Sequence, residues 1–249
     1  MFEYSDYVYY IMYVVGFALM MVISIKTCGK YGIQKKSARN YTLLTYVYGV
    51  AGAMIMGKIY TAAAKHFGSD EGSRVAIFGA VIFTPLFLLI TLKLQKKDAR
   101  AYMDLLTPGI FVILTCAKFG CFLDGCCAGF PTQHGIYNPK LEMTVFPVQL
   151  CEVATMTALI LGTQYFFKKS NRHIKGLCYP VTAALYCVCR FGWEFARYYS
   201  VAELGSVFLS LTFWQLWCIL VFIVCSAIII TAVYKAKNTE HKTAKKPKH

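Results

Sequence analysis

The sequence predicts an all-α integral membrane protein with seven transmembrane helices, an external N-terminus and a cytoplasmic C-terminus. Three observations support this prediction. Hydrophobic residues make up 57% of the 249 residues and charged residues only 15%, against roughly 45–50% and about 25% in soluble domains. Seven apolar runs approach or exceed the roughly 20 residues that cross a bilayer. Basic residues are concentrated in alternate connections between these runs.

The predicted helices follow from these runs in chain order. Three runs hold no charged residue, namely Tyr7–Ile25, Val75–Leu92 and Leu204–Tyr234. Four more contain or adjoin a charge: Tyr41–Ala64 with Lys58, Leu105 onward to Lys118, Phe146–Phe167 with Glu152, and Gly176–Tyr199 with Arg190, Glu194 and Arg197. We therefore divide the chain into a seven-helix transmembrane domain at residues 1–235 and a basic cytoplasmic tail at residues 236–249. Acidic Glu3 and Asp6 precede the first run, which argues against a signal peptide.

Basic residues set the expected orientation, because cytoplasmic connections carry an excess of Lys and Arg. With seven crossings, most of the 26 basic residues fall on one side. They lie in four segments, at residues 26–39, 93–100, 168–175 and 235–248. The net charge of +14 thus reflects membrane topology and attraction to anionic headgroups. We expect the membrane, and no nucleic acid, as the partner of these charges.

Ionisable residues inside the runs are informative, because each is costly if it faces lipid. At about 1.5 Å per helical residue, Lys58, Lys118, Glu152 and Arg190 reach similar depths, in the layer under the external leaflet. Arg190, Glu194 and Arg197 are spaced i, i+4, i+7 and share one helix face. We therefore expect charges from four helices to converge.

Two interpretations of this convergence are open. In one, Glu152 and Glu194 form interhelical ion pairs that serve only structure, although buried pairs are poor stabilisers. In the other, surplus positive charge lines a cavity that holds a phosphate-bearing lipid headgroup. We favour the second interpretation, because Arg suits bidentate phosphate binding. Gly49, Gly52 and Gly57 are expected to permit close helix contact.

A segment rich in glycine and cysteine, Lys118–Thr132, follows the fourth run. Its glycines and Pro-Thr turn make a regular helix unfavourable beyond Cys121, and such backbone near membrane depth must line a cavity or pack on protein. The C-x4-C-C spacing of Cys121, Cys126 and Cys127 matches no common zinc pattern. We predict packed thiols and no metal, with a disulfide open at an oxidising face.

This segment resembles the signature of bacterial prolipoprotein diacylglyceryl transferases, in which a basic residue leads into a Gly-Asn-Phe-x-x-Gly-type loop. Further blocks are similar to family elements in order and spacing. Residues 147–152 (PVQLCE) resemble Pro-x-Gln-Leu-Tyr-Glu, and residues 190–197 (RFGWEFAR) resemble Arg-x-x-x-Glu-Phe-x-Arg. Residues 57–60 (GKIY) resemble a Gly-x-Arg-x-Tyr element more weakly. The resemblance covers residues 41–200.

The chain departs from the family pattern at four positions. Lys118 stands where the family has Arg, Cys121 where it has Asn, and Cys126 where it has an acidic residue. The family's His-Gly-Gly element, whose His is implicated in catalysis, appears as Phe78-Gly79-Ala80. The reaction is therefore less directly implied than family membership.

The resemblance implies transfer of a diacylglyceryl group from phosphatidylglycerol to the thiol of a lipoprotein-precursor cysteine, in the bacterial plasma membrane and without a cofactor. The implied catalytic residues are Lys118, Arg190 and Glu194, and the implied substrate-binding residues are Lys58, Tyr60, Asp124, Glu152 and Arg197. The general base is open: His66, Asp124 or no dedicated base. Two alternatives are also open, a catalytically silent paralogue that binds anionic lipid or lipoprotein, and a transferase with another donor or acceptor.

Overall fold

The computed structural model describes residues 7–66, 76–169, 174–198 and 211–244. Helices dominate these residues, with one short hairpin. The helices are α1 (Tyr7–Thr27), α2 (Lys35–His66), α3 (Phe78–Leu94), α4 (Ala99–Asp124), α5 (Val148–Lys169), α6 (Cys178–Glu194) and α7 (Phe213–Ala244), with a 3-10 turn, η1 (Cys28–Tyr31). The antiparallel strands are β1 (Pro131–Asn138) and β2 (Met143–Val145).

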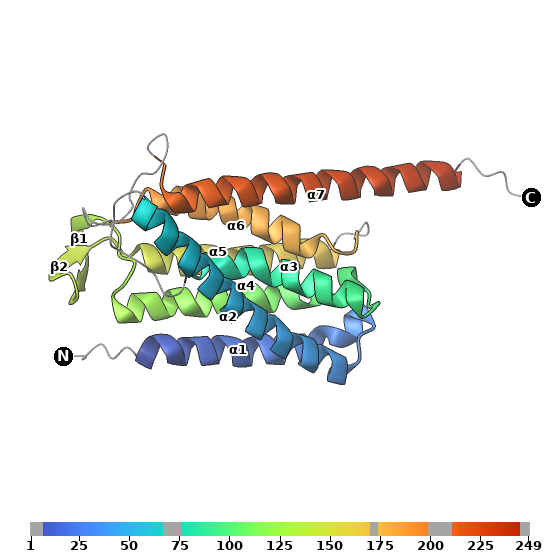
Figure 1. Ribbon diagram of the computed structural model, residues 1–249, viewed down its shortest axis with the longest axis horizontal. Coiled ribbons are helices and arrows are strands. Elements are labelled where there is room, and N and C mark those ends of the chain that lie inside the picture. The colour runs from blue at the N-terminus through green and yellow to red at the C-terminus, as the bar shows by residue number, and fades with distance from the viewer. Residues whose placement is uncertain (1–6, 67–75, 170–173, 199–210, 245–249) are drawn as a thin grey trace, which may run out of the picture.

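Helix α4 forms the centre of the bundle (Figure 1). Its residues 101–111 are all buried, and α1, α5 and α6 pack along it. Helix α2 crosses the bundle obliquely and packs on α3, while α7 packs on α6. The β hairpin lies at the same end of the bundle as the start of α1 and the start of α7 (Figure 1).

Five helices, α1, α2, α4, α5 and α7, are long and apolar enough to cross a membrane, and α3 is a shorter apolar helix. Large apolar side chains are exposed on the outward faces of these helices. For example, Val14, Leu161 and Ile230 are between 64% and 68% exposed. Because soluble proteins rarely expose large continuous apolar faces, these faces fit a lipid environment. The chain is a multi-pass membrane protein.

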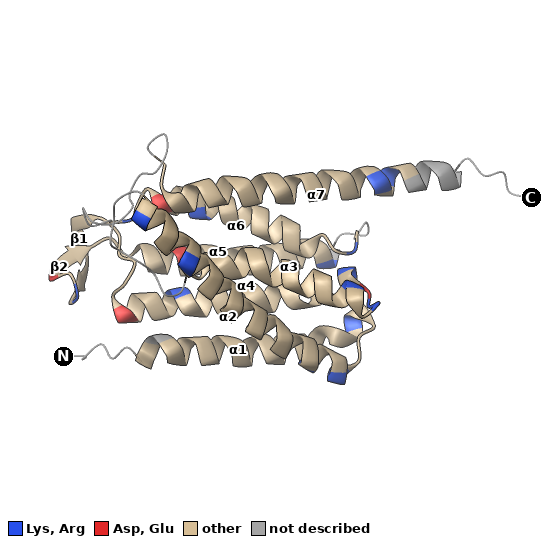
Figure 2. Ribbon diagram, in the orientation of Figure 1, with Lys and Arg blue, Asp and Glu red and all other residues tan. Residues whose placement is uncertain are grey.

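Charged residues are distributed unevenly along the bundle axis (Figure 2). Lys and Arg residues mark the end where α1 connects to α2 and α3 connects to α4. Further charges lie toward the other end, near the hairpin. The bundle thus has one basic end and one end at which charges of both signs meet.

Several predicted boundaries were wrong. Helix α4 continues past Cys121 to Asp124, because Gly125 adopts a left-handed conformation (φ 77°) and ends the helix only there. Helix α6 ends at Glu194 rather than Tyr199, a residue outside the described part of the chain. Helix α7 extends to Ala244, beyond the predicted end at Tyr234, and the predicted run at residues 204–210 lies outside the described residues. The hairpin was not predicted.

Glycines bring α2 and α3 into close contact, as expected for Gly52. A Cβ atom on Gly79 would lie 2.2 Å from the carbonyl oxygen of Gly52 and 2.4 Å from the Cβ of Met56. A Cβ on Gly52 would lie 2.7 Å from the Cβ of Phe83. The Gly52 carbonyl belongs to the backbone of α2, so it cannot move away without separating the two helices. Only glycine fits at this crossing.

Replacing Gly79 by alanine is therefore expected to destabilise the protein by about 1–3 kcal/mol, the usual cost of overpacking. Gly162 in α5 provides a matched control, because nothing lies within 4 Å of a Cβ built there. Gly162→Ala is expected to be neutral or to stabilise by up to about 1 kcal/mol through helix propensity. Thermal unfolding of the purified detergent-solubilised variants measures both effects. Equal stability of the two variants would contradict the packing assigned to this crossing.

Candidate functional site

Five charged residues meet at the hairpin end of the bundle, and we call them the ion-pair cluster. Lys118 comes from α4, Glu152 from α5, Arg190 and Glu194 from α6, and Arg197 from the segment directly after α6. Their side chains are only 1–8% exposed. The predicted convergence of charges is confirmed for these three helices.

Glu152 is the centre of the cluster, because all three cations contact its carboxylate. Lys118 Nζ lies 3.0 Å from Oε2, and one terminal nitrogen of Arg197 donates to both carboxylate oxygens at 2.8 and 2.9 Å. Arg190 Nε lies 3.5 Å from Oε1. A single carboxylate thus joins α4, α5 and α6, and removing it would leave three cations facing one another.

Glu194 is the second carboxylate that pairs with Arg190 and Arg197. Its Oε2 accepts a hydrogen bond from Arg190, one helical turn earlier, and lies 3.3 Å from Arg197 Nε. Its Oε1 accepts a hydrogen bond from the Thr212 hydroxyl at 3.0 Å, just before α7. Glu194 therefore holds both guanidinium groups in place and ties the cluster to α7.

The ion-pair cluster carries one more positive charge than negative, since three cations face two carboxylates. An uncompensated charge inside a membrane protein is costly, and an anion that binds beside it removes this cost. Arginine and lysine at fixed positions suit phosphate oxygens in particular. The arrangement can therefore bind one singly charged phosphate group.

Two predicted binding residues on α2 lie outside the cluster. Lys58 is exposed, and within the described ranges no ion pair of Lys58 with a cluster residue occurs, so Lys58 is not part of the ion-pair cluster. Its role in substrate binding stays a prediction. Tyr60 stacks on Trp214 at 5.2 Å and meets Phe213 edge-on at 5.4 Å. Tyr60 thus packs α2 against α7. The surplus charge is consequently smaller than four converging cations would have given.

The candidate general bases also occupy other places. Asp124 pairs with Lys140 at 2.7 Å and thereby ties the end of α4 to the hairpin. His66 is the last residue of α2 and is exposed. The ion pair with Lys140 thus gives Asp124 a structural role at the hairpin.

The glycine-containing segment after α4 is held between the ends of α5 and α6. Gly129 N donates to Phe146 O at 3.1 Å, and Phe130 N donates to Ala196 O at 3.1 Å. A Cβ on Gly129 would lie 2.4 Å from the Phe146 carbonyl oxygen and 2.9 Å from that of Ala196. Glycine is required here because the three backbones approach so closely. This contact fixes Arg197 beside Glu152, since Gly129 pairs directly with Arg197.

Three thiols gather in the same segment. The sulfur atoms of Cys121, Cys126 and Cys127 all lie within 4.8 Å of one another. Hydrogen bonds with the Cys121 and Cys126 thiols, together with the positive charges of Arg197 and Lys118, lower the pKa of the Cys127 thiol well below its usual value. The expectation that these thiols are merely packed holds for buried Cys121 but not for Cys127, which is exposed.

Phe78, the residue at the family's His position, lies in the apolar core. It is 5% exposed and stacks on Tyr186 with ring centroids 6.1 Å apart. Tyr186 is buried one helical turn before Arg190 on α6. An aromatic pair thus occupies the position next to the cluster where a histidine was expected from the family pattern.

Sequence reasoning missed the residues that support the cluster. Thr212 lies inside the uncharged apolar run Leu204–Tyr234, so no sequence signal marked it. Gln149 donates to Cys126 O at 2.7 Å and anchors the thiol segment to α5. Gln149 belongs to the block at residues 147–152, and that block could have identified it. Asn138, which donates to Gly125 O at 2.7 Å, came from the unpredicted hairpin.

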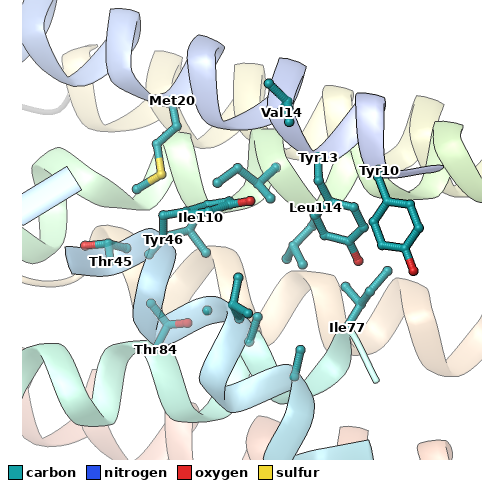
Figure 3. A pocket seen from close by; sticks show the side chains of 15 residues that line it. Tyr10, Tyr13, Val14, Met20, Thr45, Tyr46, Ile77, Thr84, Ile110 and Leu114 are labelled. Carbon is teal, nitrogen blue, oxygen red and sulfur yellow. The ribbon is translucent and has the colours of Figure 1, made fainter. Parts of the chain in front are cut away.

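A cavity of about 510 Å³ lies between α1, α2, α3 and α4 (Figure 3). Its lining is mostly apolar, and none of the five cluster residues contributes to it. Tyr10, Tyr13 and Ile77 lie toward one end, and Met20 and Thr45 toward the other (Figure 3). Leu114 lines the cavity four residues before Lys118, and residues so spaced share a helix face. Along α4, the cavity lining thus comes within about one helical turn of Lys118.

Comparisons with known proteins agree with the sequence blocks. A family model described as prolipoprotein diacylglyceryl transferase matches residues 3–231. The chain is 25% identical over 203 residues to phosphatidylglycerol–prolipoprotein diacylglyceryl transferase 2 of Clostridium perfringens, covering 77% of this chain and 78% of the relative. A transferase of the same name from Clostridium tetani is 24% identical over 203 residues (77% and 80%). One from Dehalococcoides mccartyi is 27% identical over 135 residues, 51% of each chain.

Proposed function

The chain belongs to the prolipoprotein diacylglyceryl transferase family, and we propose that it transfers the diacylglyceryl group of phosphatidylglycerol to a lipoprotein-precursor cysteine. The reaction forms a thioether to the glycerol carbon and releases glycerol phosphate. It takes place at the outer leaflet of the bacterial plasma membrane. Both substrates are named in the descriptions of the curated relatives.

One observation carries the proposal, namely the surplus positive charge buried in the ion-pair cluster. The phosphodiester of phosphatidylglycerol has a single negative charge, so its binding would make the cluster neutral. During transfer, the bond from the glycerol carbon to the phosphate oxygen breaks and further negative charge develops on that phosphate. Preorganised cations stabilise such a developing charge more than they stabilise the bound substrate.

The cluster residues have separate roles in this mechanism. Lys118 and Arg190 bind the phosphate, and to do so they exchange part of their contact with Glu152 for contact with phosphate oxygens. Arg197 stays paired with Glu152 through both carboxylate oxygens. Glu194 orients the two arginines. Catalytic roles thus fall to Lys118 and Arg190, and positioning roles to Glu152, Glu194 and Arg197.

The apolar cavity provides the space for the lipid tails. Its lining comes within about one helical turn of Lys118 along α4, and about 510 Å³ lies in the range typical of ligand sites. An acyl chain in this cavity places the glycerol backbone at the cluster end. The donor is then held by an apolar contact for its tail and an ionic contact for its phosphate.

The proposed topology has seven spans, with α3 and α6 crossing as shorter helices and the N-terminus outside. The basic end of the bundle (Figure 2) then faces the cytoplasm, as cytoplasmic connections usually do. The ion-pair cluster at the opposite end faces the outer leaflet. This orientation places the site where exported precursor proteins reach the membrane.

A transfer assay tests the proposed function. The purified full chain is mixed with phosphatidylglycerol labelled in its acyl chains and a peptide carrying a lipobox cysteine. Labelled peptide is expected, whereas the same peptide with serine in place of the cysteine should remain unlabelled. Phosphatidylethanolamine, which lacks a net negative charge, serves as the donor control and should give no product.

A second candidate function is a catalytically silent protein that binds anionic lipid, and Phe78 favours it because a buried aromatic ring replaces the family's histidine. Saturable binding of phosphatidylglycerol without labelled peptide would favour that candidate and contradict the transferase. Transfer with only another donor or acceptor would preserve the reaction class and overturn the assigned substrates.

A further inference from the structure

The three thiols beside the ion-pair cluster form a set that neither the cluster chemistry nor simple packing explains. Cys121 lies in the last turn of α4 and is buried, whereas Cys126 is partly buried and Cys127 is exposed. Thiols that serve only as small apolar core residues are normally buried. The exposed position of Cys127 therefore calls for another explanation.

The local backbone brings the thiols together despite their unusual spacing. Gly125 reverses the chain with φ 77°, and Cys127 itself has φ 57°, a left-handed conformation that is uncommon for any residue other than glycine. The segment is also held by hydrogen bonds from Gln149 to Cys126 O and from Tyr198 to Ala128 O. The three sulfur positions are thus determined by the fold.

The sulfur separations suit coordination of one metal ion. All three sulfur atoms lie within 4.8 Å of one another. A tetrahedral zinc ion with Zn–S distances of 2.3 Å requires sulfur atoms about 3.8 Å apart, which small side-chain rotations provide. Thiolate ligands select zinc and other soft or borderline ions over magnesium and calcium. Among the placed residues, no His, Asp or Glu atom joins the three thiols, so these residues leave the fourth position of a tetrahedral ion to another ligand.

Two cations lie beside the thiols, where they would offset the negative charge of metal-bound thiolates. Lys118 lies three residues before Cys121 on the same face of α4. Arg197 pairs with Gly129, two residues after Cys127. Both cations belong to the ion-pair cluster, so a metal at the thiols would be held close to the phosphate site.

A disulfide explains the arrangement less well. The adjacent pair Cys126–Cys127 has Cα atoms about 3.8 Å apart across a trans peptide bond, closer than the roughly 4.4–6.8 Å of ordinary disulfides. A disulfide from Cys121 to Cys126 or to Cys127 would leave the third thiol unpaired. Coordination of one metal ion, in contrast to a disulfide, engages all three sulfur atoms.

We propose that Cys121, Cys126 and Cys127 bind one zinc ion through three thiolates, and that its open fourth position receives the thiol of the acceptor cysteine. The second part of this proposal rests on the proposed function. An open position is typical of catalytic rather than structural zinc sites. A thiol that coordinates zinc there would lose its proton and become the nucleophile.

Transfer from the zinc-bound thiol conserves atoms and electrons. The acceptor thiol gives its proton to water when its sulfur coordinates zinc. A sulfur lone pair then forms the bond to the glycerol carbon, while the bond between that carbon and the phosphate oxygen breaks. The electron pair of the broken bond leaves with glycerol phosphate. No atom is oxidised or reduced.

The experiment uses Co2+ as a spectroscopic probe for zinc. The full chain is purified in detergent, reduced, freed of metal with a chelator, and titrated with Co2+ under anaerobic conditions. We expect thiolate-to-cobalt charge-transfer absorption that saturates at one equivalent and disappears on addition of Zn2+. Cys127→Ser should lower the Co2+ affinity by more than tenfold, since even the loss of an outer-shell partner costs about 10–100-fold. Cys116→Ser on α4 is the matched control and should bind normally.

The open position is tested on the same sample. A lipobox peptide with its cysteine should change the charge-transfer spectrum, and the serine peptide should not. Absence of the thiolate absorption, or its survival in Cys127→Ser, would overturn the metal site, and so would a disulfide that persists after reduction. No spectral response to the cysteine peptide would overturn the role of the fourth position. If the spectra respond but labelled phosphatidylglycerol yields no product, the metal site stands and the transferase function fails.

Discussion

Replacing Arg190 by alanine is expected to abolish diacylglyceryl transfer, lowering the rate by at least about 10²–10³-fold, the usual cost of removing one preorganised donor from a developing oxyanion. Arg190 is 7% exposed and lies between Glu152 and Glu194, so it can reach a phosphate only at the cluster. The transfer assay with labelled phosphatidylglycerol measures the rate.

Folding has to be separated from catalysis in this experiment, because Arg190→Ala also removes a partner from two buried carboxylates. Arg190→Lys keeps the positive charge and the pairing, but loses the planar fork that binds two phosphate oxygens at once. We expect this variant to stay folded, to elute as the wild type in size-exclusion chromatography, and still to lose most activity. Arg39→Ala, an exposed change on α2, is the control. Wild-type transfer by Arg190→Ala would contradict the mechanism.

Replacing Glu152 by glutamine is expected to destabilise the folded protein by about 3–5 kcal/mol, the range found when one partner of a buried ion pair is removed. The change leaves three buried cations facing only Glu194. Because those cations then lack an anion, added sulfate or phosphate should recover part of the lost thermal stability. Thermal unfolding with and without these ions measures both effects.

Glu142→Gln provides the matched control, since Glu142 is an exposed residue near the hairpin. The control should unfold at the wild-type temperature and respond to phosphate no more than the wild type does. If Glu152→Gln is as stable as the control, the carboxylate does not hold the cluster together. If it is unstable but insensitive to anions, the surplus charge is not accessible to phosphate.

The sequence predicted the three helices that carry the cluster because buried charges in apolar runs leave a clear signal. The spacing of Arg190 and Glu194 alone places them on one helix face, and their depth matched that of Lys118 and Glu152 once the helix directions were assigned. Arg197, expected on the same face, lies just after the end of α6 instead. Both steps need only helix geometry and the cost of charge in lipid. The partner of each cation could not be predicted, because it depends on helix rotation and packing.

Lys58 shows that depth along a helix does not suffice to predict which charged side chains meet. Its predicted level along α2 is similar to that of the cluster, yet its side chain is exposed. Helix α2 crosses the bundle obliquely and packs on α3 through Gly52 and Gly79, and this contact determines which face of α2 turns inward. A lysine near the end of a span can reach the interface with its long side chain, so exposure there costs little.

The close approach of the three thiols could not be predicted, for a different reason. Spacing rules for metal sites describe turns of ordinary conformation, and the C-x4-C-C pattern did not fit them. The structure uses a helix that continues to Asp124 and two left-handed residues, Gly125 and Cys127, to turn the chain back. A left-handed cysteine cannot be predicted from sequence, because the segment is held by residues distant in the chain. Gln149 of α5 contacts Cys126 O, and Gly129 packs on the backbone of Phe146 and Ala196.

The position of the donor phosphate tests the central claim most directly, and a structure of the chain in complex with phosphatidylglycerol measures it. We predict phosphate oxygens within about 3.2 Å of Lys118 Nζ and the Arg190 guanidinium, with an acyl chain entering the cavity beside Leu114. A phosphate bound elsewhere, with Lys118 and Arg190 still fully paired to the carboxylates, would contradict the account.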